Sequence, residues 1–167
     1  MSAPDSVPNR VQVRVASPAD TPLILKFIRE LAEYERLAHE VECGEADIRR
    51  DLFGENPRAF CDIAEADGVP VGFALWFYSY STFRGRAGIY LEDLFVEPGA
   101  RGVGAGKALL ARLAQRCVEA ELGRLEWSVL DWNTPAIEFY DSLGAMRKEG
   151  WTVRRVYGEA LERLAEG

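Results

Sequence analysis

The chain has 167 residues, a formal net charge of −7, and 48% hydrophobic and 28% charged residues. These values are ordinary for one soluble domain with a real core. An acidic chain without a long basic cluster argues against a nucleic-acid partner, because phosphate contacts need concentrated Lys and Arg, and it favours cationic small ligands.

The three cysteines, Cys43, Cys61 and Cys117, lie far apart and match no metal-ligand spacing. We therefore expect buried, reduced thiols and no metal site. The first residues are polar, and no apolar stretch approaches the roughly 20 residues of a membrane span. The sequence predicts a cytoplasmic protein without a membrane partner, in which a flexible tail over residues 1–10 precedes a single domain over residues 11–167.

The hydrophobic pattern predicts an α/β fold with one mixed β-sheet and helices on both faces. The expected order is strand, helix, helix, three strands, helix, strand, helix, strand. In that order the elements span residues 11–16, 21–35, 45–53, 60–66, 69–78, 89–96, 107–121, 124–130, 134–143 and 151–157. Residues 79–88 are expected to be a polar connector, and residues 161–165 a terminal turn.

Short signals mark the ends of some elements. Thr21 and Pro22 are typical of an N-cap followed by proline at the first helical position. Asp67 and Gly68 stand between two apolar runs, which indicates a β-hairpin.

The most informative stretch is residues 89–110, an apolar strand followed by a glycine-rich turn and a helix. Gly102, Gly104 and Gly106 let backbone N–H groups approach a ligand closely. The following helix adds N–H groups without intrahelical acceptors and a partial positive charge. Together these features predict a cradle for a phosphate or pyrophosphate.

The spacing excludes two common nucleotide motifs. Ala108 stands where a P-loop has Ser or Thr, and Arg101 stands where it has its first glycine. The dinucleotide pattern G-x-G-x-x-G fails because no glycine stands at its last position. The observed spacing is Arg101-x-x-Gly104-x-Gly106, which resembles the acetyl-CoA motif of the GNAT superfamily of N-acetyltransferases.

The resemblance covers nearly the whole chain. The stretches that carry it look like the diamine acetyltransferase branch, which holds spermidine/spermine and thialysine N-acetyltransferases: residues 90–93, 101–106, 132–133, 139–140, 144–145 and 149–151. Residues 80–82 and 129–133 look closer to the thialysine type. The resemblance implies acetyl transfer from acetyl-CoA to a primary amine of a small molecule, either a thialysine- or lysine-like amino acid or a di- or polyamine. It also implies a homodimer.

The resemblance implies how acetyl-CoA would be held. Backbone groups of the strand would pair with the pantetheine arm as another strand would, and the glycine-rich turn would hold the pyrophosphate. Asn133 could hold the arm or merely cap its helix. The implied cofactor-binding residues are Leu94, Phe95, Val96, Arg101, Gly102, Val103, Gly104, Ala105, Gly106, Lys107, Asn133, Thr134, Pro135, Ala136 and Tyr140.

Two carboxylates, Glu92 and Asp93, stand inside an apolar strand, where burial without a partner is costly. Neighbouring strand residues face opposite sides, so the two acids cannot share a role unless a bulge intervenes. The resemblance implies that Glu92 takes a proton from the ammonium through water, and that Tyr140 protonates the leaving thiolate. An ion-paired acid and a core aromatic residue stay open as structural alternatives.

The resemblance also implies an amine site that contains Phe27, Ile28, Glu92, Asp93, Glu126, Trp127, Ser128 and Glu149. Phe27 is equally a core residue, and Glu149 is equally a solvated acid. The polyamine enzymes carry an acidic residue at the position of Thr82 and an aromatic residue at that of Arg84. Arg pairs well with carboxylates, so a carboxylate-bearing amine becomes more plausible.

His39 is the only histidine and lies in an expected loop, so a Ser–His–Asp or Cys–His arrangement is not expected. Direct attack within a ternary complex is the simpler mechanism. Two other classes stay open: a non-catalytic acyl-CoA sensor or interaction module, and an acetyltransferase for a peptide N-terminus or an antibiotic. Glu92 and Tyr140 together argue for catalysis.

Overall fold

The computed structural model describes residues 10–167, so the expected tail, apart from Arg10, lies outside the described residues. The described chain divides into two compact units, the first ending at Ser128 and the second spanning Val129–Gly167. The expectation of a single domain over residues 11–167 stays a prediction. No helix of the described chain is long and apolar enough to cross a membrane.

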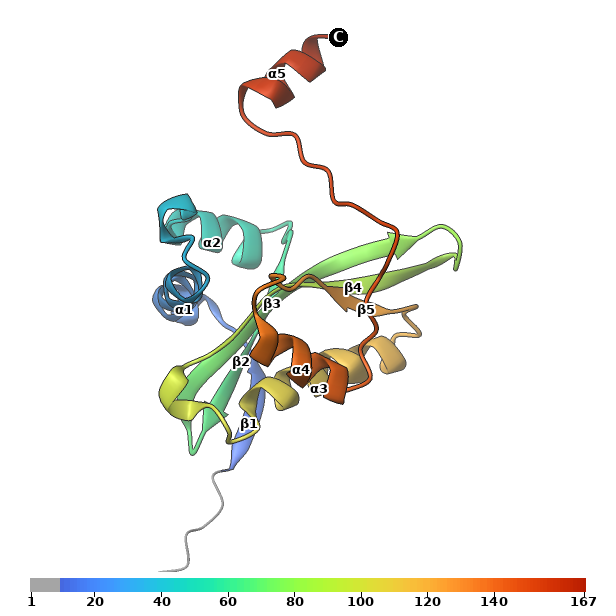
Figure 1. Ribbon diagram of the computed structural model, residues 1–167. Helices are drawn as coiled ribbons and strands as arrows, with labels where there is room; N and C mark the ends of the chain where they lie inside the picture. The colour runs from blue at the N-terminus through green and yellow to red at the C-terminus, as the bar shows by residue number, and fades with distance from the viewer. Residues whose placement is uncertain (1–9) are drawn as a thin grey trace, which may run out of the picture. The chain divides into compact units, whose positions relative to one another are not determined.

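The first unit is built on a five-stranded sheet in the order β1-β2-β3-β4-β5. Neighbouring strands are antiparallel except for β4 and β5, which are parallel, so the sheet is mixed as predicted. The elements of this unit (Figure 1) are β1 (Val11–Val15), α1 (Thr21–Tyr34), α2 (Glu45–Phe53), β2 (Phe60–Ala66), β3 (Val69–Ser81), β4 (Arg86–Val96), α3 (Ala105–Glu119) and β5 (Leu125–Trp127).

Helices cover both faces of the sheet, which confirms the predicted fold class (Figure 1). The alternation of side chains along β2 shows why helices can pack on both faces of the sheet. Cys61 and Ile63 pack with Phe27 of α1 in the core on one face. Asp62, between them, points to the other face, where Arg116 of α3 donates a hydrogen bond of 2.8 Å to it. Successive strand residues point to opposite faces, so one strand serves both helical layers.

Several element ends differ from the prediction by one or two residues. Asp20, rather than Thr21, is the N-cap of α1, because a short 3₁₀ turn over Pro18–Asp20 precedes this helix. The helix α3 begins at Ala105 rather than at residue 107, with Gly104 as its N-cap. The predicted hairpin is confirmed, since Asp67 and Gly68 both have positive φ angles, of 52° and 80°.

The expected polar connector over residues 79–88 is wrong. Strand β3 continues to Ser81, β4 begins at Arg86, and Ser79 pairs with Gly88. This end of the hairpin is a ribbon that reaches beyond the core, where Tyr80 is 64% exposed. Polar side chains are compatible with a strand wherever the neighbouring strand satisfies its backbone groups.

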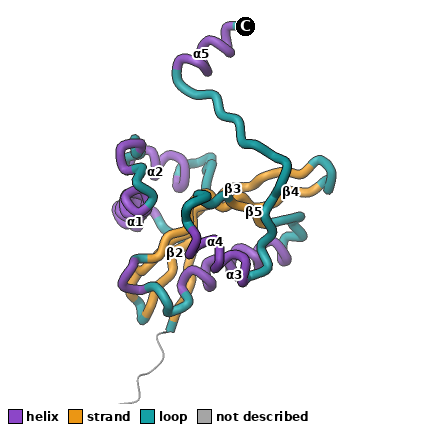
Figure 2. Tube along the Cα trace, in the orientation of Figure 1, coloured by secondary structure: helices purple, strands orange, loops and turns teal. Residues whose placement is uncertain are grey.

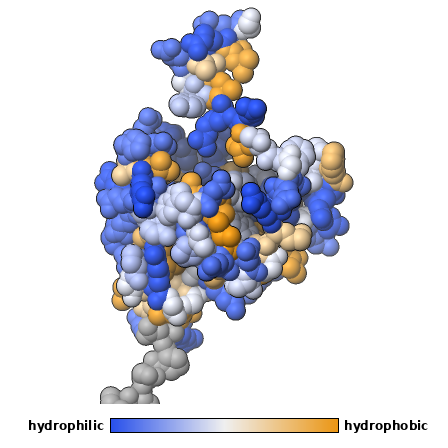
Figure 3. Space-filling model, viewed as in Figure 1, coloured by the Kyte–Doolittle hydropathy of each residue, from blue (hydrophilic) through white to orange (hydrophobic). Residues whose placement is uncertain are grey.

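The second unit contains two helices, α4 (Thr134–Ser142) and α5 (Glu159–Glu166). The predicted last strand, residues 151–157, is wrong: this segment is an irregular stretch (Figure 2). No strand forms within residues 129–167, so an extended segment in this unit has no neighbour with which to pair. The expected terminal turn is instead part of α5, whose Leu161 and Leu164 are exposed. The surface of this terminal helix carries both hydrophobic and hydrophilic colours (Figure 3).

Candidate active site

The strand β4 changes register at the two candidate carboxylates. Leu75 of β3 pairs with Asp93, but the next residue, Trp76, pairs with Leu91, so Glu92 is the extra residue of a β-bulge. The indole of Trp76 donates a hydrogen bond of 3.0 Å to Asp62, so Trp76 and its partner Leu91 face α3. Asp93 faces α1 instead. The bulge therefore supplies the break in alternation that the sequence left open.

Burial of Asp93 raises its pKa to about 7, and the negative charges of Glu92 and Glu35 contribute in the same direction. Among the described residues, no cation forms an ion pair with this carboxyl. Two residues further along β4, Phe95 joins the core against α1. Asp93 is therefore a partly buried acid at the edge of an apolar core, whereas Glu92 is exposed.

A third acid, Glu35, was missed by the sequence reasoning. It is the C-cap of α1, and burial raises its pKa. A carboxylate at a helix C-terminus meets the unfavourable negative end of the helix dipole. The position of Glu35 after the last helical residue was therefore a signal in the sequence that this acid has a role other than capping. Glu35, Glu92 and Asp93 form what we call the acidic cluster, which suits an ammonium group.

The glycine-rich turn has the geometry of an anion cradle. Gly102 and Gly104 have φ angles of 90° and 89°, a region that favours glycine. A Cβ at either position would meet nothing within 4 Å, so open space lies in front of these backbones. The first amides of α3 have no acceptor within the helix. The residues present therefore fit a pyrophosphate.

The end of β4 has an open edge within the first unit. Strand β5 pairs only with Ile89–Leu91. Leu94, Phe95 and Val96 pair with β3 on one side, and no strand of this unit pairs with their other side. This edge offers the backbone groups that a pantetheine arm needs.

Phe27 lies in the core. Its side chain is 0% exposed, and its ring centroid lies 5.6 Å from that of Phe73 and 6.0 Å from that of Phe95. Ile28 packs against the same core cluster. The packing role of Phe27 is thus shown, and contact of either residue with an amine stays a prediction.

The predicted residues near β5 make contacts within the first unit. Glu126 forms an ion pair of 3.2 Å with Arg124. The hydroxyl groups of Ser128 and Tyr90 lie 2.8 Å apart, which joins the end of β5 to β4. Trp127 is half-buried in β5. Their roles toward a substrate stay predictions.

Arg84 lies at the opposite end of β4 from the acidic cluster. It belongs to the β3–β4 turn and lies beside Gly123. Glu92 follows Arg86 by six positions along β4, which corresponds to about 20 Å. Arg84 therefore cannot contact the same small acceptor as Glu92 of its own chain.

The second unit contains the predicted residues Asn133, Thr134, Pro135, Ala136, Tyr140 and Glu149. Asn133, which is 8% exposed, caps α4 by accepting a hydrogen bond of 3.4 Å from the amide of Ala136. Thr134 and Pro135 complete the first turn. The ring of Tyr140 lies 5.5 Å from that of Phe139. Glu149 is exposed, and its role, like those of Asn133 and Tyr140, stays a prediction.

Residues 25–145 match the family described as Acetyltransferase (GNAT) family. The chain belongs to this family. It is 42% identical to thialysine N-epsilon-acetyltransferase of Bos taurus, over 93% of this chain and 97% of that protein. It is 35% identical to spermidine/spermine N(1)-acetyltransferase-like protein 1 of Homo sapiens, over 92% of this chain and 24% of that protein. An integron cassette protein from V. cholerae has a similar solved structure, with a TM-score of 0.77 and 26% identity, over 94% of this chain and 98% of that one.

These relationships confirm the predicted family, branch and reaction class. The chain is an acetyl-CoA-dependent N-acetyltransferase that acts on an amine of a small molecule. No group of three His, Cys, Asp or Glu side chains within residues 10–167 is arranged to hold a metal ion.

Proposed function

We propose that this enzyme acetylates the terminal side-chain amine of thialysine or a similar lysine-like amino acid. The observation that carries the proposal is the 42% identity to a thialysine N-epsilon-acetyltransferase along 93% of the chain. The acidic cluster supports it, because three carboxylates from β4 and the end of α1 suit an ammonium group. A polyamine is the second candidate, on the 35% identity to the spermidine/spermine relative.

The first requirement of the reaction is loss of a proton from the amine. An alkyl ammonium has a pKa of about 10, so proton transfer to an ordinary carboxylate costs about 8 kcal/mol. Transfer to Asp93, whose pKa is about 7, costs only about 4 kcal/mol. In this proposal the negative charge of Asp93 holds the ammonium, and the proton passes through water beside Glu92 to Asp93, the carboxyl group with the raised pKa.

The second requirement is a positioned acetyl donor. Acetyl-CoA supplies the acetyl group as a thioester when bound. The turn from Gly102 to Lys107 would hold the pyrophosphate through backbone N–H groups, and the open edge of β4 would pair with the pantetheine amides. Tyr140 is the proposed proton donor to the departing sulfur. Direct attack of the amine nitrogen then needs no covalent enzyme intermediate.

We further propose a cytoplasmic homodimer without nucleic-acid or membrane partners. Exposed apolar side chains in the second unit, including Trp151 and Tyr157, support association with a second copy. Light scattering coupled to size-exclusion chromatography should give twice the mass of the 18.7 kDa chain. A monomer at micromolar concentration would contradict this part of the proposal.

The substrate assignment is tested by following CoA thiol release from acetyl-CoA with thialysine, lysine, ornithine, putrescine, spermidine and an N-terminal peptide. Thialysine should give the highest kcat/KM. Tyr140→Phe should abolish release and Glu92→Gln should strongly reduce it, whereas Glu55→Gln, at an exposed loop position, should leave it unchanged. Preference for spermidine over every amino acid would replace the proposed acceptor by a polyamine.

A further inference from the structure

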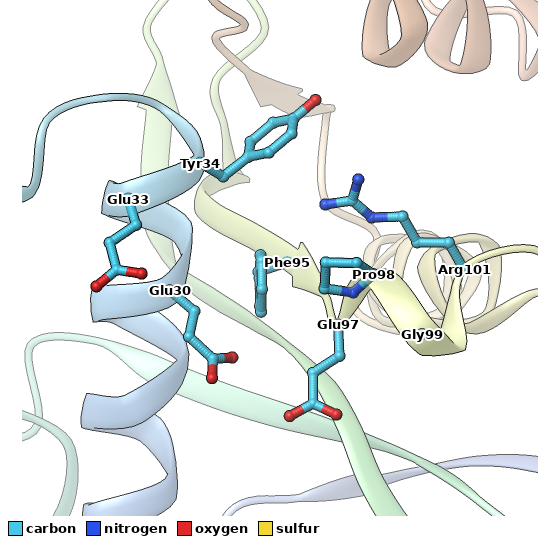
Figure 4. A pocket seen from close by; sticks show the side chains of 8 residues that line it. All are labelled: Glu30, Glu33, Tyr34, Phe95, Glu97, Pro98, Gly99 and Arg101. Atoms are coloured by element: carbon cyan, nitrogen blue, oxygen red, sulfur yellow. The ribbon is translucent and has the colours of Figure 1, made fainter.

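The acetyl donor and the acceptor need separate paths to the acidic cluster. A pocket of about 540 Å³ lies between α1 and the end of β4, and Tyr34, Phe95 and Arg101 are among the residues that line it (Figure 4). Phe95 and Arg101 belong to the proposed acetyl-CoA site, so this pocket lies on the cofactor side of Asp93. An acceptor bound in the same ternary complex therefore has to extend from Asp93 in the opposite direction along β4, toward Tyr90.

The β-bulge places the side chains of Tyr90 and Asp93 next to each other on one face of the sheet. Leu91 faces α3, so its neighbour Tyr90 faces the side of α1, as Asp93 does. Because Glu92 is the extra residue of the bulge, residues 90 and 93 correspond to positions i and i+2 of a regular strand, which are about 7 Å apart. Tyr90 is thus the side chain that follows Asp93 on this face.

Two aromatic side chains, Phe77 and Tyr90, form an aromatic pair beside the acidic cluster. Phe77 of β3 pairs with Tyr90 of β4, and their ring centroids lie 5.2 Å apart with an angle of 31° between the ring planes. Both side chains are half-buried, so each retains surface that a ligand can contact. Aromatic rings bind carbon chains, and they make favourable contacts with the polarizable sulfur of a thioether. The aromatic pair therefore suits an apolar or sulfur-containing segment of a ligand.

The ring of Tyr90 is held in place by both neighbouring strands. Its face contacts Phe77 of β3, and its hydroxyl group lies 2.8 Å from that of Ser128 at the end of β5. Tyr90 also pairs with Glu126 in the parallel register of β4 and β5. A side chain that is already fixed loses little further freedom when a ligand binds. All of these residues belong to the first unit, so the aromatic pair is a preorganised surface within it.

The dimensions of thialysine match this arrangement. Three bonds separate its terminal nitrogen from its sulfur, a span of about 4 Å when extended. A nitrogen hydrogen-bonded to the carboxylate of Asp93 lies about 3 Å from it, so the sulfur can lie about 7 Å from that carboxylate. This equals the distance of about 7 Å between Asp93 and Tyr90 along the strand. An amine held at Asp93 therefore places the sulfur beside the aromatic pair.

We propose that Phe77 and Tyr90 bind the thioether of the acceptor, so that the enzyme selects its substrate by the atom in the middle of the side chain as well as by the terminal amine. The inference rests on the proposed function and deepens it. Lysine has a methylene at this place, which keeps apolar contact with the rings but lacks the sulfur. The ether analogue O-(2-aminoethyl)serine has an oxygen there, which is much less polarizable than sulfur and loses the favourable contact with the rings.

Thialysine and the ether analogue test this assignment at saturating acetyl-CoA, because they differ only in one atom. The wild-type kcat/KM should favour thialysine by about two- to tenfold, the usual range of one sulfur–aromatic contact. Tyr90→Leu should bring this ratio close to one. The loss should appear as a higher KM for thialysine at nearly unchanged kcat, because the rings contact the side chain both before and during the reaction. Tyr90→Phe should keep the wild-type ratio, since it keeps the ring.

The ratio of two acceptors on one variant cancels any loss of folded enzyme, and Phe77→Leu decides in the same way where Tyr90→Leu does not fold. Tyr78→Leu is the matched control. Tyr78 follows Phe77 on β3, but its ring lies 5.3 Å from that of Trp76 on the α3 face, so this variant should keep the wild-type ratio.

A wild-type ratio of one, or a ratio unchanged in Tyr90→Leu, would overturn the assignment of the thioether to the aromatic pair while leaving amine acetylation intact. An equal loss of the ratio in Tyr78→Leu would overturn it as well, because that ring lies on the other face of the sheet. Failure to turn over thialysine, lysine and the ether analogue alike would overturn the proposed function itself.

Discussion

Replacing Asp93 by asparagine should raise the unfolding free energy relative to wild type, and this gain should be larger at alkaline pH than at acidic pH. Burial raises the pKa of Asp93 from 3.8 to about 7. Between these two values the folded chain binds more protons than the unfolded chain, so stability falls as the pH rises through this window. The full effect is about 4 kcal/mol above pH 7, and up to about 3 kcal/mol of it develops between pH 5 and pH 8.

The quantity to measure is the difference in unfolding free energy between Asp93→Asn and wild type, from urea titrations at pH 5 and pH 8. Asparagine carries no titrating group at this position, so the difference should shift toward the variant by up to about 3 kcal/mol between the two pH values. Ile63→Val is the matched control. Its fully buried side chain should give a loss of about 1 kcal/mol at both pH values.

A difference between Asp93→Asn and wild type that is equal at pH 5 and pH 8 would refute the reasoning, because it would mean that Asp93 is ionised throughout this range in the folded chain. The variant Glu35→Gln gives an independent test of the raised pKa of Asp93. The charge of Glu35 contributes to the raised pKa of Asp93, so its removal should lower that pKa and reduce the pH dependence. Acetylation by Asp93→Asn should meanwhile fall, since the stabilised variant lacks the charge that holds the ammonium.

Three further substitutions test the fold and the cofactor turn. Arg116→Met should lower the unfolding free energy by about 3–5 kcal/mol in urea titrations, because it leaves the carboxylate of Asp62, which is 1% exposed, as an uncompensated buried charge. A loss below about 1 kcal/mol would show that the Arg116–Asp62 ion pair is not needed for stability. Gly104→Ala should raise the KM for acetyl-CoA in steady-state kinetics. The φ angle of Gly104 is 89°, and a non-glycine residue costs about 1–2 kcal/mol in this left-handed region. An unchanged KM would place the pyrophosphate elsewhere. Phe27→Leu should lower the melting temperature while leaving the KM for the amine unchanged, and the opposite pattern would indicate direct substrate contact.

Local sequence signals predicted the elements whose formation depends on local chemistry. Asp67 and Gly68 adopt the positive φ angles that a tight hairpin needs, and α2 has the expected bounds with Gly54 at its end. The predictions for residues 79–88 and 151–157 were wrong because pairing with a neighbouring strand decides whether a segment forms a strand. The first pairs along the β3–β4 hairpin despite its polar side chains. The second has a strand-like sequence, but its unit contains no strand.

The candidate site was predicted where a motif encodes it and missed where burial creates it. The spacing of Arg101, Gly104 and Gly106, placed between an apolar strand and a helix, predicted the anion cradle, and together with the resemblance along the chain it predicted the family. By contrast, the raised pKa of Asp93 depends on how α1, β3 and β4 pack together. No local pattern reports that packing. The acid of α1, Glu35, joins the cluster only because the end of its helix lies beside β4.

The β-bulge at Glu92 is the feature that converts a buried strand into an active-site strand. In a regular strand, residues 91 and 93 would face the same side of the sheet, and a one-residue slip would turn every following side chain to the other face. Here Leu91 faces α3, with its partner Trp76, whereas Asp93 and Phe95 face α1. Without the extra residue, either Leu91 would leave the α3 core or Asp93 would turn away from Glu35. Deleting one residue at this position should therefore abolish the raised pKa of Asp93, and with it the acidic cluster, even in a chain that still folds.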